Sequence, residues 1–169
     1  KEILGKRTDI TIFFLVFITT GFLWGFIPLT ASFLNPGPFP PNNIFYPYAD
    51  AAKFDLQSQS VLLGLGFNSG LALDRPVYPL FLSIIHLISG QLVTNNMFAQ
   101  AFLFGVFPAV VYLICVELCS RSLGISTAIA LCLWGVNAIQ ANNLLNTSTP
   151  KQILTDFPMA IMLSLVLYV

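Results

Sequence analysis

Long runs of apolar residues with few charges constrain this chain more than any other feature. The first covers residues 10–34 and contains no Asp, Glu, Lys or Arg. Because an α-helix rises about 1.5 Å per residue, this run can cross a hydrocarbon core of roughly 30 Å. Residues 97–118 and 125–141 are two further runs of sufficient length. We therefore expect an all-α polytopic membrane protein with about four transmembrane segments, the last of which starts within residues 157–169.

The overall composition favours the same class. Apolar side chains make up 56% of the residues and charged ones only 8%, whereas soluble domains carry roughly 25% charged residues. The formal net charge is zero, and no nucleic-acid motif or polybasic run is present, so we expect no nucleic-acid partner. The three cysteines lie in apolar segments and are odd in number, which argues against a disulfide framework.

Basic residues set the expected orientation in the membrane. Lys6 and Arg7 precede the first run, and the positive-inside rule places them in the cytoplasm. The loop of residues 35–96 is then exoplasmic, or periplasmic in a bacterium. Arg121 lies in a short hairpin expected to be cytoplasmic, so residues 142–156 return to the exoplasmic side. We interpret the sequence as one membrane domain that is incomplete at its C-terminal end, because its last apolar run is too short to span.

The first exoplasmic loop is expected to hold two helices at the membrane surface. Residues 35–47 are rich in Pro and Gly, which do not continue a helix. Apolar residues then recur at helical spacing through residues 50–65, and a polar face including Gln57 and Ser60 is expected to meet water or a cavity. Residues 77–89 form a second apolar helix of roughly 20 Å, which is too short to span the bilayer.

Three carboxylates are candidates for chemistry on this side of the membrane. Asp50 and Asp55 lie in the first surface helix, and Asp156 precedes the last apolar run. Ionisable groups within a bilayer cost roughly 2.5 to 3.5 kcal/mol, so their presence near one favours a function. The alternative is that Asp50 and Asp156 cap helices by accepting hydrogen bonds from free N–H groups of a first turn. Capping and catalysis are compatible. Two or three carboxylates could also hold Mg²⁺ or Mn²⁺.

Several short motifs follow one another in the first outer loop. An early Asp precedes a segment ending in Leu-Leu-Gly-x-Gly-Phe, and Arg-Pro-x-Tyr-Pro-Leu-Phe-Leu comes next. In this order and spacing they resemble the N-terminal part of the membrane-embedded GT-C glycosyltransferases, above all protein O-mannosyltransferases and related lipid A and cell-envelope glycosyltransferases. The matching residues are Asp50, Phe54, Asp55, Leu62, Leu63, Gly64, Gly66, Phe67, Arg75, Pro76, Tyr78, Pro79, Leu80 and Gly90.

The resemblance implies a GT-C-like module that transfers a sugar from a polyprenyl-phosphate donor to an exoplasmic acceptor hydroxyl, with inversion of the anomeric centre. The catalytic base of such enzymes is the Asp of the first loop, which corresponds to Asp50. Arg75 and Lys151 are the candidate cations for the donor phosphate. Asp156 matches a second acidic position that helps to place substrate or, in oligosaccharyltransferase relatives, a divalent metal; we assign no metal ligand. Asp55 either supports Asp50 or pairs with a nearby lysine or water.

Alternatives remain open for single residues and for the whole chain. Arg75 could instead anchor lipid headgroups or pair with Asp74. His86 stands in an apolar helix and is interpreted as a helix residue at the membrane interface. Residues 146–148, Asn-Thr-Ser, fit a glycosylation sequon on the expected outer side. The rival function is that of a non-catalytic, GT-C-derived subunit that packs against other membrane subunits in a larger complex.

Overall fold

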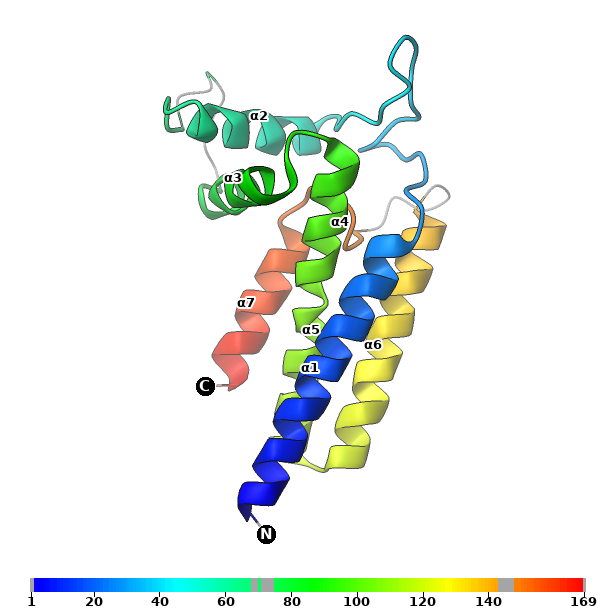
Figure 1. Ribbon diagram of the computed structural model, residues 1–169, viewed down its shortest axis with the longest axis vertical. Helices are drawn as coiled ribbons and strands as arrows, with labels where there is room; N and C mark the ends of the chain where they lie inside the picture. The colour runs from blue at the N-terminus through cyan, green and yellow to red at the C-terminus, as the bar shows by residue number, and fades with distance from the viewer. Residues whose placement is uncertain (1, 68–69, 71–74, 143–147, 169) are drawn as a thin grey trace.

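The computed structural model describes residues 2–67, 70, 75–142 and 148–168, and these residues fold into seven α-helices (Figure 1). The helices are α1 (Glu2–Phe26), α2 (Asp50–Leu62), α3 (Val77–Ser89), α4 (Val93–Phe104), α5 (Val106–Leu118), α6 (Arg121–Ala141) and α7 (Asp156–Tyr168). Within the described residues, strand pairing is limited to one isolated bridge between Phe39 and Ile44. The predicted all-α class is confirmed for this part of the chain.

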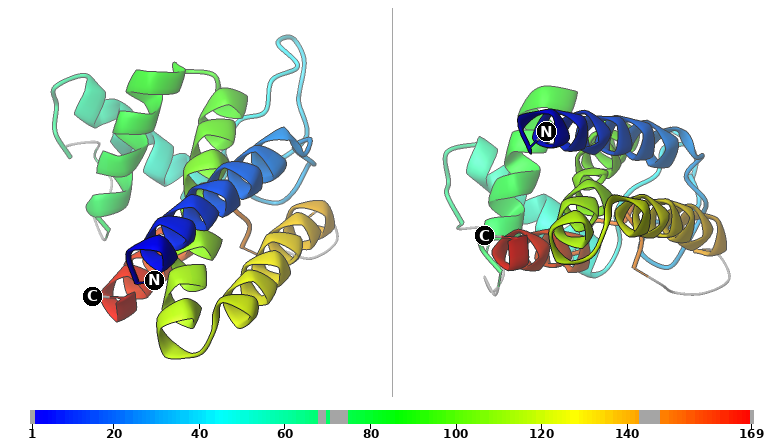
Figure 2. Two further views of the ribbon diagram at one scale, coloured as in Figure 1. Left: turned by 60° about the horizontal axis from the view of Figure 1, so that its bottom comes forward. Right: turned by 90° about the horizontal axis from the view of Figure 1, so that it is seen from below.

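Five helices, α1 and α4 to α7, form an elongated assembly that we call the bundle. Helix α1 packs against α4 and α5, while α6 and α7 lie on opposite sides of α5 (Figures 1 and 2). The segments Lys6–Phe26, Val93–Leu118 and Arg121–Ala141 are long and apolar enough to cross a membrane. The described residues thus contain three candidate spans. Helix α7, where a further segment was expected to start, is a shorter apolar helix.

The first membrane helix lies earlier in the chain than predicted. It was expected over residues 10–34, but α1 begins at Glu2 and ends at Phe26. Pro28 lies two residues after this end, and proline supplies no backbone N–H for a helical hydrogen bond. The chain then turns, with Ser32 N donating to Asn35 O at 2.9 Å. The helix therefore includes the charged residues before the apolar run and excludes the apolar residues after Pro28.

The second span is two helices in succession. The sequence predicted one helix over residues 97–118, whereas α4 begins at Val93 and gives way to α5 at Gly105. A Cβ atom at Gly105 would stand 2.6 Å from Gly21 N on α1, so only glycine fits there. Small residues at such contacts let the backbones of membrane helices approach closely. Gly105 thus fixes the crossing of α1 with the second span.

The third span also begins earlier than the predicted residues 125–141. Ser120 is the N-cap of α6, and its hydroxyl accepts a hydrogen bond from Leu123 N at 3.3 Å.

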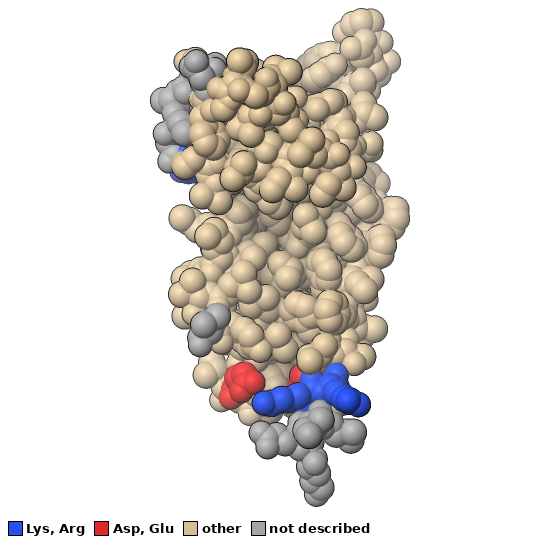
Figure 3. All heavy atoms as spheres, turned by 60° about the vertical axis from the view of Figure 1, so that its left-hand side comes forward, with Lys and Arg blue, Asp and Glu red and all other residues tan. Residues whose placement is uncertain are grey.

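Arg121 Nε donates to Asp9 Oδ1 on α1 at 2.7 Å, and Tyr112 OH donates to the same oxygen at 2.9 Å. Figure 3 shows charged side chains gathered at this end of the molecule, beyond a broad band without charge on the face in view.

Helices α2 and α3 lie across the opposite end of the bundle (Figure 1). We call α2, α3, residues 93–100 of α4 and residues 148–155 the crown. The two helices predicted in the first loop are present, although α2 ends at Leu62 rather than at residue 65. Gly64 and Gly66 follow with positive φ angles, which end the helix. Stacked rings of Phe81, Phe104 and Phe157 join the crown to the bundle.

Candidate functional site

The crown buries polar side chains that the sequence analysis had placed in water. Gln57 and Ser58 on α2 are fully buried, and Ser60 is 7% exposed. The prediction that Gln57 and Ser60 face water or a cavity is therefore wrong. Helix α3 packs against α2 and covers this face, so amphipathic spacing did not show which side meets solvent. Ala51 and Phe54 of the predicted apolar face lie in the core, whereas Leu65, predicted on the same face, is exposed.

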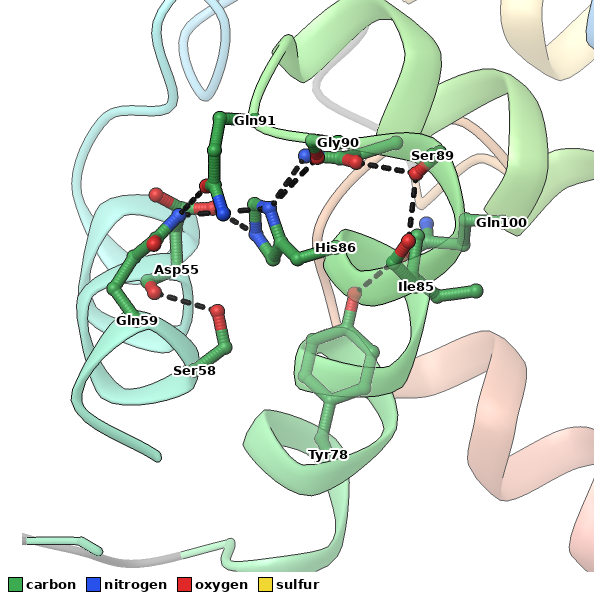
Figure 4. Close-up of polar contacts among 11 residues, drawn as sticks. Asp55, Ser58, Gln59, Tyr78, Ile85, His86, Ser89, Gly90, Gln91 and Gln100 are labelled. Atoms are coloured by element: carbon green, nitrogen blue, oxygen red, sulfur yellow. Dashed lines mark hydrogen bonds and ion pairs between the residues drawn. The ribbon is translucent and has the colours of Figure 1, made fainter. Parts of the chain in front are cut away.

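A hydrogen-bond network centred on His86 joins α2, α3 and α4 (Figure 4). His86 Nε2 lies 2.9 Å from Asp55 Oδ1, and His86 Nδ1 lies 2.9 Å from Asn96 Nδ2. Gln59 Nε2 is 3.5 Å from the same Nδ1 and donates to Gln91 at 2.6 Å. His86 Nδ1 also lies 3.3 Å from Gly90 O. Asn96 Nδ2 can donate to Nδ1 only in the tautomer with the ring hydrogen on Nε2, and in that tautomer Nε2 donates to the Asp55 carboxylate.

This network is the main feature of the crown that sequence reasoning missed. His86 was interpreted as a residue at the membrane interface, yet its side chain is 1% exposed and both ring nitrogens have partners. A buried polar group without a partner costs several kcal/mol, so a histidine among isoleucines requires one. This requirement could have predicted that His86 has a hydrogen-bond partner, but it does not identify that partner. His86 therefore holds the crown together and does not reach an outside substrate.

A second buried network anchors the segment before α7. Gln100 Nε2 donates to Gln152 O at 2.7 Å and to Pro150 O at 3.2 Å, while Tyr78 OH donates to Gln100 Oε1 at 2.8 Å. Gln152 Nε2 in turn donates to Asn142 Oδ1 at 2.6 Å. These bonds fix residues 148–155 beneath α3 and α4.

Two of the predicted acidic residues act electrostatically on a member of this network. Burial raises the pKa of Tyr78 well above its ordinary value, and the negative charges of Asp55 and Asp156 raise it further. Both carboxylates therefore act on Tyr78 electrostatically, one from α2 and the other from the start of α7. The two acidic residues lie far apart in the sequence, and Tyr78 lies on α3.

Arg75 connects the loop before α3 to the segment before α7. Its Nη1 donates to Thr155 Oγ1 at 2.6 Å, and Thr155 directly precedes Asp156, the first residue of α7. Both Arg75 and Asp156 are exposed. A cation and a carboxylate of the predicted site are thus neighbours at the surface of the crown. Asp74, the alternative partner of Arg75, lies outside the described residues, as do Asn146 and Thr147 of the sequon.

Asp50 is exposed and belongs to the first turn of α2. It was expected at the N-cap, but that position is taken by Ala49, which has a φ angle of 52°. The helix begins after this turn in the backbone, and no side chain caps it. A carboxylate in the first turn is stabilised by the partial positive charge of the helix N-terminus. Asp50 stands about one and a half turns before Asp55 on the same helix.

Lys151 is buried in the crown, away from water. It is 6% exposed, and its Nζ donates to Gly25 O at 2.7 Å and also to Ile27 O. Burial lowers the pKa of Lys151 to about 8. The lysine therefore binds the C-terminal end of α1. Its hydrogen-bond partners are not those of Arg75.

The carboxylates do not form a divalent-metal site in the described part of the chain. No group of three or more His, Cys, Asp or Glu side chains gathers there. Mg²⁺ is often held by one or two carboxylates together with substrate phosphates, so this finding concerns only a centre built from the protein's own side chains. No such centre is present in the described part of the chain.

Comparisons of the chain with protein-family models, curated proteins and solved structures found no match. The resemblance to GT-C glycosyltransferases therefore stays a prediction based on short motifs and on their order.

Proposed function

We propose that the crown transfers a sugar, with inversion, from a polyprenyl-phosphate donor to an acceptor hydroxyl. The observation that supports this most is the hydrogen bond between Arg75 and Thr155. It joins residues 80 positions apart and sets a cation of the first outer loop beside Asp156 in the second. A phosphate leaving group needs such a cation, and a sugar hydroxyl needs a carboxylate within reach.

The transfer is a single displacement. The Asp50 carboxylate takes the proton of the acceptor hydroxyl while the hydroxyl oxygen attacks C1 of the sugar. The bond from C1 to the phosphate oxygen breaks, and its electron pair leaves with the lipid phosphate. Arg75 stabilises the negative charge on that phosphate. Attack on the face opposite the leaving group inverts the anomeric centre.

The other predicted residues have supporting roles. Asp156 and Asp55, which both raise the pKa of Tyr78, position the substrates and shape the electrostatic field of the site. Lys151 binds the end of α1 and so fixes the segment that carries Thr155. The bilayer supplies the lipid donor, which reaches the crown from the apolar surface of the bundle.

Transfer with purified protein tests this proposal. The full chain is incubated with a panel of polyprenyl-phosphate sugars and a hydroxyl acceptor, and wild type is compared with Asp50→Asn. The variant keeps the shape of the side chain but loses the base, so we expect a rate at least about 100-fold lower. Glu117→Gln, at the opposite end of the bundle, is the matched control and should keep the wild-type rate.

The alternative, a non-catalytic subunit of a membrane complex, is favoured by one observation. Buried polar groups of the crown, including those of His86 and Gln100, bond to one another rather than opening toward a ligand. Absence of transfer by the wild-type protein with every donor would support this alternative and contradict the transferase.

A further inference from the structure

A cavity of about 280 Å³ lies between the end of α1 and the beginning of α4. Its walls include the lysine of the crown, two polar residues of the first turn of α4, and apolar residues of α1 and the segment that follows it. The lining residues are Gly25, Phe26, Ile27, Pro28, Leu29, Thr94, Asn95, Met97, Phe98 and Lys151. Lys151 is the single titratable residue among them.

Among the described residues, no carboxylate balances the charge on the ammonium group of Lys151. Within the described part of the chain, its partners are two carbonyl oxygens, those of Gly25 and Ile27. An ammonium group has three N–H donors, so a third hydrogen is left for another acceptor. A buried cation is costly unless it is paired, which favours an anionic ligand here.

Helix ends do not cancel this charge. The C-terminal end of α1 contributes about −0.5 elementary charge through the carbonyls that Lys151 contacts. The first turn of α4, with Thr94 and Asn95 in the cavity wall, contributes about +0.5, and no side chain caps that helix. The cavity therefore keeps close to one full positive charge.

The remaining wall is suited to a lipid. Phe26 and Phe98 pack edge to face with ring centroids 5.2 Å apart, and Phe26 is 71% exposed on the outside of the bundle. An apolar surface thus adjoins a positively charged cavity at the end of a candidate membrane span. A ligand with an anionic head and acyl chains satisfies both parts.

We propose that this cavity binds the phosphate headgroup of an anionic membrane lipid, with the phosphate on Lys151 and the chains along Phe26 and Phe98. Thr94 and Asn95 supply further hydrogen-bond donors for the phosphate oxygens. This site does not depend on sugar transfer, because a lipid bound here need not react. It would join α1, α4 and residues 148–155 through one ligand.

The test measures binding by thermal stabilisation of the full chain in detergent. The probes are dihexanoyl phosphatidic acid, dihexanoyl phosphatidylcholine and inorganic phosphate. We expect phosphatidic acid to raise the unfolding midpoint of the wild type most strongly. Lys151→Met should weaken its binding at least about tenfold, because a charge-assisted hydrogen bond is lost. Lys53→Met, on α2 outside the cavity, is the matched control and should bind as the wild type does.

A second variant guards against misfolding, since Lys151→Met also removes the bonds to α1. Thr94→Phe fills the cavity from the opposite wall and leaves the bonds of Lys151 intact. It should also weaken phosphatidic acid binding at least about tenfold. Unchanged binding in Thr94→Phe, or equal stabilisation by phosphatidic acid and phosphatidylcholine, would overturn the proposal. Equal stabilisation by inorganic phosphate would overturn the assignment to a lipid.

Discussion

The bundle and the crown of this protein bury their residues by different means. In the bundle, glycines let backbones and rings come close, as where Gly105 packs against Gly21 of α1 and where Gly135 packs against Trp24. In the crown, buried histidine and amide side chains such as His86 and Gln100 satisfy one another. The bundle should therefore be sensitive to added volume, and the crown to the loss of a hydrogen-bond partner.

Added volume in the bundle should have the largest effect on stability. In Gly105→Ala, the new Cβ would lie 2.6 Å from Gly21 N, which forces α1 and the second span apart. We expect the free energy of unfolding in mixed detergent micelles to fall by about 3 kcal/mol. The control is Gly37→Ala, where the new Cβ meets only Ala31 Cβ at 3.7 Å. Equal loss in both variants would contradict the close-contact account.

Removal of a partner in the crown should have the next largest effect. Asn96→Leu removes the nearest donor to the buried His86 Nδ1 and leaves the longer contact with Gln59 Nε2 at 3.5 Å, so we expect a loss of about 2 kcal/mol. The matched control is Asn137→Leu on the exposed surface of α6, which should change stability by less than about 0.5 kcal/mol. A similar small change in Asn96→Leu would show that the network does not stabilise the crown.

A double-mutant cycle should measure a smaller interaction energy between two residues of the crown. Asp55 and His86 are bonded at 2.9 Å, and the Asp55 side chain is 20% exposed. Solvent weakens this pair, so Asp55→Ala and His86→Ala should couple by about 1 kcal/mol. The cycle of Asp50→Ala with His86→Ala should be additive within about 0.3 kcal/mol. Equal coupling in the two cycles would mean that the contact with Asp55 is not specific.

The smallest effect is a dependence of crown stability on pH. The pKa of Lys151 is about 8 in the folded protein and near 10.5 in the unfolded chain, so the unfolded chain binds more protons above pH 8. Stability contributed by this group therefore rises as the pH rises from about 8 to 10.5. Between pH 7.5 and 8.5 the rise should be below about 1 kcal/mol. Lys151→Met should lack it; an identical pH profile in both proteins would contradict the assignment.

Sequence reasoning located the elements of the bundle better than their ends. The length of the runs without charged residues predicted three long apolar helices, because a span needs about 20 apolar residues. It did not predict that α1 includes Asp9, since the partners of that carboxylate, Arg121 and Tyr112, come from distant parts of the chain. Pro28 was a usable stop signal, and Ser120 a usable start signal, for the two helix ends that were misplaced.

The crown was predicted less well for a physical reason. Helical spacing separates two faces of α2, but it does not reveal that α3 covers the polar one and buries Gln57. The pairing of Arg75 with Thr155, and of Lys151 with the end of α1, depends on tertiary contacts between distant residues. The sequence was therefore sufficient to name Arg75 and Lys151 as candidates. The structure was needed to show that they bind different parts of the protein.

The proposed function requires the crown and the Arg121 end to lie on opposite sides of a membrane, with the crown on the outer side. Cys119 is exposed at the Arg121 end and serves as a reporter once Cys115 and Cys132 are replaced by Ala. A second reporter is Asn42→Cys in the exposed loop before α2, in a chain whose three native cysteines are Ala.

Labelling of right-side-out vesicles with a membrane-impermeant maleimide is the most direct measurement. The account predicts that Asn42→Cys reacts at once and that Cys119 reacts only after the membrane is permeabilised. Reaction of Cys119 from outside, alone or together with Asn42→Cys, would contradict it.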